Sequence, residues 1–196
     1  MKLIVADMEG VFLPEIWIKL AEKTGIDALK LTTRDISDYD VLMTRRLAIL
    51  EENKLTLQDI EAVIATIDPL DGARQMLDWI RDRAQIIILS DTFEEFVRPL
   101  LVKLGRPTVF CHNLTIDSYG KIVQYNIRTD NQKSRAVAAF QSLNYEVIAF
   151  GDSYNDIGMI QTADHGFFFD PPSSVVTDFP DVPVTRNYAE LKQMLG

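Results

Sequence analysis

Two carboxylic acids stand two residues apart near the start of the chain, directly after a short apolar run. Asp7 and Glu9 follow residues 3–6, Leu-Ile-Val-Ala, which have the composition of a buried strand. In an open α/β sheet, ligands bind at the carboxyl ends of the strands, so acids placed there are available for chemistry. Taken alone, such a pair is also typical of a turn or of a helix start. The other strand ends must therefore decide whether the pair is catalytic.

Polar residues that could bind phosphate or a metal also occur at the ends of later strands. They are Ser90, Asp91 and Thr92 after the apolar run 85–89, Asp152, Asn155 and Asp156 after the run 146–150, and Lys133 at the start of the intervening helical pattern. Clustered carboxylates repel one another unless a divalent cation lies among them, and oxygen ligands with few histidines favour Mg²⁺ over zinc. A hydroxyl and an amine can bind phosphate oxygens while a carboxylate attacks phosphorus. The pattern therefore predicts covalent phosphoryl transfer.

The composition is that of a globular protein with one large domain, or with one core domain and a smaller insertion, in its 196 residues. The net charge of -9 argues against nucleic acid or an anionic membrane as the main partner, because both attract clustered Lys and Arg. The single cysteine, Cys111, cannot form an internal disulfide, which favours a reducing compartment. The apolar runs are too short for a signal peptide or a membrane span. We therefore expect a cytoplasmic protein.

Between residues 12 and 68, every periodic segment is helical. Helical patterns cover about 14–23 and 39–53, and a third begins at Thr56, which forms a capping-box pattern with Asp59. No strand pattern interrupts this region, so it is better interpreted as a helical insertion after the first strand than as a crossover between two strands. The sequence therefore predicts a helical cap.

Strands and helices alternate in the remainder of the chain. Strands are expected at 85–89, 108–111, 146–150 and 166–169, helices at 71–83, up to 104, from 133 and at 188–195, and a hairpin across 114–127. This alternation is typical of a doubly wound, mainly parallel α/β sheet. We therefore expect a core of residues 1–11 and 69–196, a cap of residues 12–68 and an antiparallel hairpin as an appendage.

Four motifs, in order and across the whole chain, resemble those of the haloacid dehalogenase superfamily of phosphatases. They are Asp7-Met8-Glu9-Gly10, Ser90, Lys133 and Gly151-Asp152-Ser153-Tyr154-Asn155-Asp156. The resemblance implies that Asp7 is the nucleophile and Glu9 the general acid and base, and that Asp152 and Asp156 hold Mg²⁺ directly or through water. We expect Asp7 and the backbone carbonyl of Glu9 to be the other metal ligands. The superfamily usually has aspartate at the position of Glu9.

The helical insertion occupies the place where phosphoserine phosphatases of that superfamily carry their substrate-binding cap. Residues 11–17 and 40–47 resemble those of the bifunctional phosphoserine phosphatase and homoserine phosphotransferase branch, the ThrH type. This resemblance implies phosphoserine as the phosphate donor and homoserine as a possible acceptor. The residues expected to bind the substrate are Glu15, Arg46, Ser90, Asp91, Thr92, Lys133 and Asn155.

A helical wheel supports one of these roles independently. The apolar residues of segment 42–50 span roughly 160° at about 100° per residue, and Arg46 falls in the middle of that arc. An inward arginine needs an anionic partner, whereas Arg45 at the edge of the arc can remain solvated. The partner of Arg46 is either an internal acid or a substrate carboxylate. Glu15 is either a helix-start acid or a residue that binds the substrate amine.

Three other functions compete with this one. A phosphatase for another small phosphorylated metabolite would use the same residues. A receiver-type signalling module also gathers acids, a hydroxyl and a lysine at strand ends, but its phosphorylated aspartate lies on a middle strand and it has no helical insertion after the first. A dehydrogenase is disfavoured because the chain has no G-x-G-x-x-G loop. The sequence leaves open whether the protein is a monomer or a homodimer.

Overall fold

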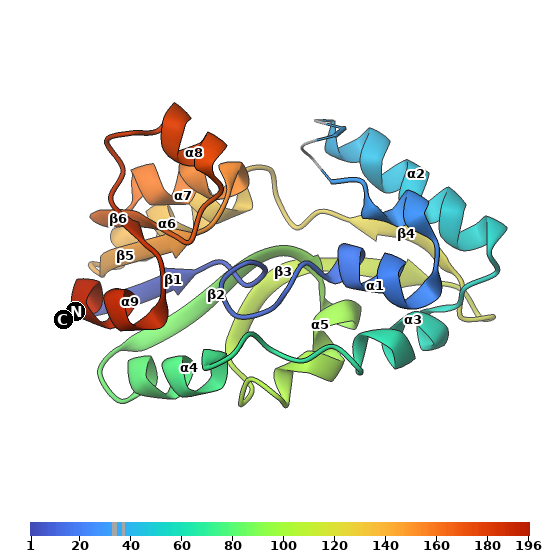
Figure 1. The fold of residues 1–196 in the computed structure, drawn as a ribbon, viewed down its shortest axis with the longest axis horizontal. Helices are drawn as coiled ribbons and strands as arrows, with labels where there is room; N and C mark the ends of the chain where they lie inside the picture. The colour runs from blue at the N-terminus through green and yellow to red at the C-terminus, as the bar shows by residue number, and fades with distance from the viewer. Residues whose placement is uncertain (33–34, 37) are drawn as a thin grey trace.

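The computed structural model describes residues 1–32, 35–36 and 38–196. Their strands form a seven-stranded sheet in the order β4-β3-β2-β1-β5-β6-β7, with the first strand at its centre (Figure 1). The strands are β1 (Lys2–Ala6), β2 (Gln85–Phe93), β3 (Thr108–Ile116), β4 (Ile122–Asn126), β5 (Glu146–Gly151), β6 (His165–Phe169) and β7 (Val184–Thr185). Neighbouring strands are parallel except β3 and β4, which are antiparallel. The expected mainly parallel α/β fold is confirmed.

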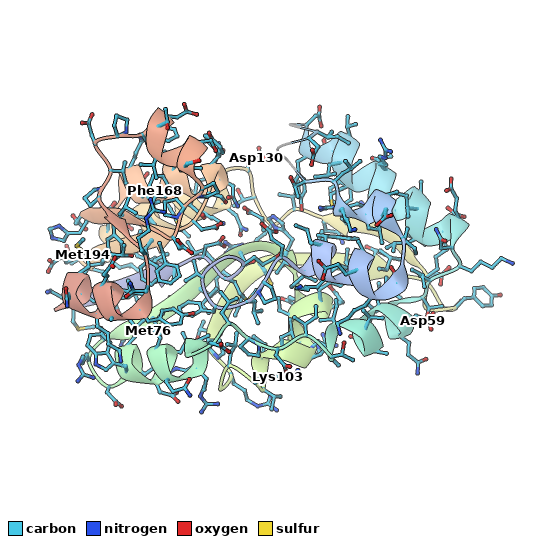
Figure 2. The ribbon with its side chains drawn as sticks, in the orientation of Figure 1. Asp59, Met76, Lys103, Asp130, Phe168 and Met194 are labelled. Carbon is cyan, nitrogen blue, oxygen red and sulfur yellow. The ribbon has the colours of Figure 1, made fainter. Side chains whose placement is uncertain are left out.

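Helices cover both faces of the sheet, which explains why the central strands are apolar without alternation. These helices are α4 (Ala73–Arg81), α5 (Glu94–Leu101), α6 (Gln132–Ser142), α7 (Ile157–Thr162), α8 (Ser173–Asp178) and α9 (Tyr188–Leu195). Ile4 of β1 packs in the cluster that contains α4, α5 and α9, whereas Val5 packs in the cluster that contains α6, α7 and α8. Phe168 belongs to the second cluster (Figure 2). The site residues therefore stand on a rigid, doubly covered sheet.

The helical insertion lies at one end of the molecule, together with β4 (Figure 1). It contains α1 (Ile16–Thr24), the 3₁₀ helix η1 (Asp27–Lys30), α2 (Tyr39–Glu52) and α3 (Leu57–Ile64). The capping box at the start of α3 is present: Asp59 N donates to Thr56 Oγ1 over 3.3 Å, and Thr56 N donates to Asp59 Oδ2 over 2.9 Å. In the part of residues 12–68 that the structure describes, the regular elements are thus helical, as the sequence predicts.

The predicted hairpin is present, but its first arm is the continuation of β3 rather than a separate strand. Strand β4 contacts α2, so the hairpin supports the insertion. Three polar contacts between described residues join the two parts: Leu57 N donates to Gly120 O over 2.8 Å, Lys121 Nζ contacts Glu51 Oε1 at 2.5 Å, and Tyr125 Oη donates to Asp40 Oδ1 over 2.5 Å. We refer to these three pairs as the hairpin contacts.

Two further details differ from the sequence expectations. Strand β2 does not end at Leu89 but continues to Phe93, with an irregular pairing to β3 between these two residues. Helix α5 contains Pro99 as predicted, but it ends at Leu101 rather than at Leu104. The short elements α7, α8 and β7 were not predicted, because they have too few residues to show a period. None of the described helices has the length and apolar character that crossing a membrane requires.

Candidate active site

Asp7 follows β1 at the centre of the sheet and forms a buried ion pair with Lys133. Asp7 is 4% exposed, and its backbone N–H donates to the carbonyl of Phe150 on the neighbouring strand over 3.0 Å. The ammonium of Lys133, from the first turn of α6, lies 2.9 Å from Asp7 Oδ1 and 2.7 Å from Asp156 Oδ1. Burial opposes the charge of Lys133, yet Asp156 and Asp7 hold its pKa well above the ordinary value. The two predicted residues Asp7 and Lys133 are therefore in direct contact.

The end of β5 brings Asp152 and Asp156 to the same place. Asp156 Oδ2 accepts from the backbone N–H groups of Asp152 and Ser153 over 3.0 and 3.1 Å, which fixes the turn after the strand. Glycines leave the space that these carboxylates occupy. A Cβ at Gly151 would lie 2.2 Å from Asp156 Cγ, and one at Gly10, whose φ is +75°, would lie 2.4 Å from Asp152 Cγ. The glycines of both motifs are thus needed for packing.

Three of these acids could hold a divalent cation. One carboxylate oxygen from each of Asp7, Asp152 and Asp156 lies within 4.8 Å of the others, and within residues 1–32, 35–36 and 38–196 no other such acidic group occurs. Burial, followed by repulsion from Asp156, raises the pKa of Asp7 although Lys133 opposes the shift. Negative charge is in excess here because three carboxylates face one ammonium. Buried oxygen donors with excess negative charge fit Mg²⁺. The side chain of Glu9 lies outside this group, and its backbone carbonyl stays a predicted ligand.

Ser90 and Asp91 lie in the irregular part of β2, and Asp91 contacts Lys133. Ser90 is 1% exposed, and its hydroxyl accepts weakly from Thr92 N over 3.4 Å. Asp91 Oδ2 lies 3.3 Å from Lys133 Nζ and accepts from Asn155 Nδ2 over 2.8 Å. Burial alone would raise the pKa of Asp91, but Lys133 and two amide donors hold it below its usual value. Asp91 and Asn155 therefore connect the motifs to one another, and their contact with a substrate stays a prediction.

Glu9 points toward the helical insertion. Its Oε2 accepts from the backbone N–H of Ile16, the first residue of α1, over 2.8 Å. Burial, followed by repulsion from Glu15, raises the pKa of Glu9 to about 8. At neutral pH this carboxyl therefore holds a proton that it could donate.

Most of the predicted residues, but not Lys133 or Asp156, line one cavity of about 120 Å³ between the strand ends and the insertion. The predicted site residues on its wall are Asp7, Glu9, Glu15, Arg46, Ser90, Asp91, Thr92, Asp152 and Asn155. Lys133 lines a neighbouring, larger cavity of about 580 Å³, to which Asp91 and Asn155 also contribute. Core and insertion thus each supply one wall of the smaller cavity. The hydroxyl of Thr92 is buried there without a hydrogen-bond partner among the described residues.

Arg46 points inward, as the helical wheel predicts. It is 7% exposed, donates from Nη2 to Leu31 O over 2.9 Å and stacks on Trp17 with 4.4 Å to the ring centroid, whereas Arg45 is exposed. Its Nε has no hydrogen-bond partner, and over the described part of the chain no carboxylate lies within 4.0 Å of its guanidinium. The described residues thus form no salt bridge to Arg46, although the nearby Glu9 and Glu15 favour its charge. A substrate carboxylate as the partner of Arg46 stays a prediction. Burial lowers the pKa of Arg46 to about 10, so it remains charged at neutral pH.

Three residues of the site were not predicted. Tyr39, the first residue of α2, donates from its hydroxyl to Asp91 O over 3.2 Å and lines both cavities. Trp17 lies under Arg46, although its place on the apolar face of α1 indicated only a core residue. Gln132 donates to Asp91, and its position beside Lys133 was the only signal in the sequence.

Comparisons with known proteins agree with this geometry. Residues 1–164 match the family model for haloacid dehalogenase-like hydrolases. The chain is 53% identical over 193 residues to phosphoserine phosphatase ThrH of Pseudomonas aeruginosa, covering 98% of this chain and 94% of that protein. It is 52% identical over 187 residues to a phosphoserine phosphatase of Pseudomonas syringae pv. tomato, covering 95% and 79%. A solved apo phosphoserine phosphatase superposes with a TM-score of 0.78 at 21% identity, covering 98% of both chains. At that identity the superposition shows a common fold.

Proposed function

We propose that this chain, which belongs to the haloacid dehalogenase-like hydrolase family, is a Mg²⁺-dependent phosphoserine phosphatase that forms a phosphoaspartate at Asp7. We also propose that it transfers phosphate from phosphoserine to homoserine. The names of the two Pseudomonas relatives support phosphoserine as the substrate. A solved phosphoserine phosphatase described as a phospho-aspartyl intermediate analogue, with a TM-score of 0.77 at 20% identity, has the same fold.

The observation that carries this proposal is the guanidinium of Arg46, which forms no salt bridge with the described residues and lies in the cavity that also contains Asp7. A buried positive charge that forms no internal ion pair can bind an anion from elsewhere. Glu15 lines the same cavity and supplies a negative charge. Together, Arg46 and Glu15 match the carboxylate and the ammonium group of an amino acid, while Asp7 and Ser90 face its phosphorylated end. A phosphorylated sugar has neither of these charged groups.

The proposed reaction uses the residues at the strand ends in two displacements. The Asp7 carboxylate attacks phosphorus, the bond between phosphorus and the serine oxygen breaks, and Glu9 donates a proton to that oxygen. Lys133 and the Ser90 hydroxyl donate to the phosphoryl oxygens. Asp7, Asp152 and Asp156 would hold Mg²⁺, which when bound would neutralise phosphoryl charge. Glu9 then takes a proton from water, whose oxygen attacks the phosphoaspartate and releases Asp7.

Homoserine is a suitable alternative to water in the second displacement. Its carboxylate and ammonium match Arg46 and Glu15 as those of serine do, so its hydroxyl is held near phosphorus. Glu9 is one methylene longer than the usual aspartate, and catalysis is sensitive to displacements of about an ångström. A small water is activated poorly by a displaced base, whereas an alcohol held in line can compete.

We propose a division of the chain into a catalytic part and a substrate-recognition part. Residues 1–11 and 69–196 form the catalytic core, and residues 12–68 form a cap that recognises the substrate. Both proposed recognition residues, Glu15 and Arg46, lie in the cap segment, while the proposed catalytic and metal-binding acids lie in the core.

The test is phosphate release by the purified protein from a panel of phosphorylated metabolites, with Mg²⁺ present. We expect phosphoserine to be turned over fastest, EDTA to abolish turnover and added Mg²⁺ to restore it. With homoserine added, ³¹P NMR should detect phosphohomoserine. A faster reaction with another metabolite would support the alternative substrate class, and a single slow turnover would support a receiver-type module. Full activity in EDTA would exclude the metal.

A further inference from the structure

Gln132 connects the site residues Ser90 and Asp91 to Arg128, which lies outside the site, through a buried side chain. It is 3% exposed at the start of α6. Its Nε2 donates to Ser90 O over 2.6 Å and to Asp91 Oδ1 over 2.8 Å, while its Oε1 accepts from Arg128 Nη2 over 2.9 Å. Because two acceptors face one side of the amide and a donor faces the other, only one orientation satisfies all partners. The side chain is therefore held in one position.

The two acceptors belong to a segment that the sheet does not hold regularly. Leu89 pairs with Phe110 and Phe93 pairs with His112, so four steps along β2 oppose two steps along β3. Residues 90–92 therefore bulge out of the regular ladder, and backbone groups in a bulge need other partners. Gln132 supplies such a partner to the Ser90 carbonyl, so it fixes the backbone from which the Ser90 hydroxyl projects.

The hydrogen bond from Gln132 to Asp91 also links Gln132 to Lys133. The other oxygen of the Asp91 carboxylate, Oδ2, lies 3.3 Å from Lys133 Nζ and accepts from Asn155 over 2.8 Å. An Asp91 carboxylate that is free to rotate would weaken its contacts to Asn155 and to Lys133, and Lys133 would then be held by Asp7 and Asp156 alone. Gln132 therefore acts on Ser90 through the main chain and on Lys133 through Asp91.

We infer that Gln132 is a positioning residue for phosphoryl transfer, which sets the Ser90 hydroxyl and the Lys133 ammonium on the phosphoryl group. This inference rests on the proposed phosphatase activity. Gln132 lies outside the wall of the cavity that contains Arg46 and Glu15, so its loss should lower kcat and leave KM nearly unchanged. Since the phosphoryl group is common to all substrates, the loss should be equal for phosphoserine and p-nitrophenyl phosphate.

The test compares Gln132→Met, which is similar in size but donates no hydrogen bond, with Gln132→Glu, which keeps an acceptor for Arg128 but cannot donate to Ser90 or Asp91. Misplacement of reacting groups by about an ångström costs up to roughly 100-fold, so we expect kcat to fall about 10- to 100-fold in both variants. Arg128→Ala is the matched control, because it removes the third bond and leaves both donors of Gln132. We expect its kcat to stay within about threefold of the wild type.

The melting temperature and KM of each variant separate positioning from folding. A kcat of Gln132→Met within about twofold of the wild type would overturn the inference, as would an equal loss in Arg128→Ala. Failure of both Gln132 variants to fold would also overturn it, because Gln132 would then be needed for folding. A wild-type protein that hydrolyses p-nitrophenyl phosphate but not phosphoserine would refute the proposed substrate, and the aryl phosphate would still test Gln132.

Discussion

Replacement of Arg46 by alanine should remove recognition of the amino-acid part of the substrate and leave phosphoryl chemistry intact. The guanidinium is buried and stacks 4.4 Å above Trp17, and its Nε has no hydrogen-bond partner among the described residues, so a substrate carboxylate bound there would be largely desolvated. Truncating one partner of such a charged pair costs about 2 to 5 kcal/mol. Taking about 3 kcal/mol, and a tenfold change in rate for each 1.36 kcal/mol, gives a loss of roughly 150-fold in kcat/KM for phosphoserine.

The assay compares kcat/KM for phosphoserine and for p-nitrophenyl phosphate, which has neither a carboxylate nor an amine. The aryl phosphate should lose less than about threefold. Arg45→Ala is the control, since Arg45 is the exposed neighbour on the same helix and should behave as the wild type. Arg46→Ala also loses the hydrogen bond from Arg46 to Leu31 and the stacking on Trp17, so a drop of a few degrees in its melting temperature is expected.

The comparison of the two substrates separates recognition from damage to the fold, because unfolding lowers both rates in the same proportion. Equal proportional losses for phosphoserine and the aryl phosphate would refute the reasoning, and so would an unchanged rate for phosphoserine. Arg46→Lys should be intermediate, because it keeps the charge but lacks the planar fork that bonds a carboxylate twice.

Three further predictions concern the core. Asp7→Asn should keep less than about a hundredth of the phosphate release, because an amide is a poor nucleophile. Its melting temperature without metal should not fall, since the raised pKa of Asp7 means that the fold disfavours its charge; a fall of several degrees would contradict this. Glu9→Asp should raise free phosphate relative to phosphohomoserine when both acceptors are present, and an unchanged product ratio would assign the choice of acceptor to the cap. Burial raises the pKa of Cys111 to about 12, so its thiol is neutral at pH 8 and a disulfide reagent should label it only after unfolding. Rapid labelling of the folded protein would show that Cys111 is accessible and ionised.

The central strands and the inward side of α2 were predictable because each depends on a pattern within one short segment. Buried parallel strands are short apolar runs, so the polar residues that follow β1 and β5 could be placed at the edge of the sheet. Arg46 could be assigned to the buried face because a helix repeats every 3.6 residues. Both assignments require only the residues of one element.

Other details that sequence patterns could not supply depend on hydrogen-bond partners in another element. Residues 90–92 are polar and suggested the end of a strand, yet β2 continues through them because Gln132 and Tyr39 satisfy the carbonyls of Ser90 and Asp91. The bond from Ile16 to Glu9 likewise gives this glutamate a role at the start of α1 that its motif does not reveal. Hydrogen bonds between separate elements leave no periodic signal in the sequence of either element.

The hairpin contacts also restrict how the cavity can open. A hinge at the two ends of the insertion would be the simplest way to swing it away from the sheet, but α2 and α3 are joined to the hairpin by a backbone hydrogen bond, an ion pair and a tyrosine–carboxylate bond. An insertion that swings as a rigid body must either break these three bonds or carry β4 with it and bend β3. In the second case, the moving unit is discontinuous in sequence, and its third hinge lies within a β-strand.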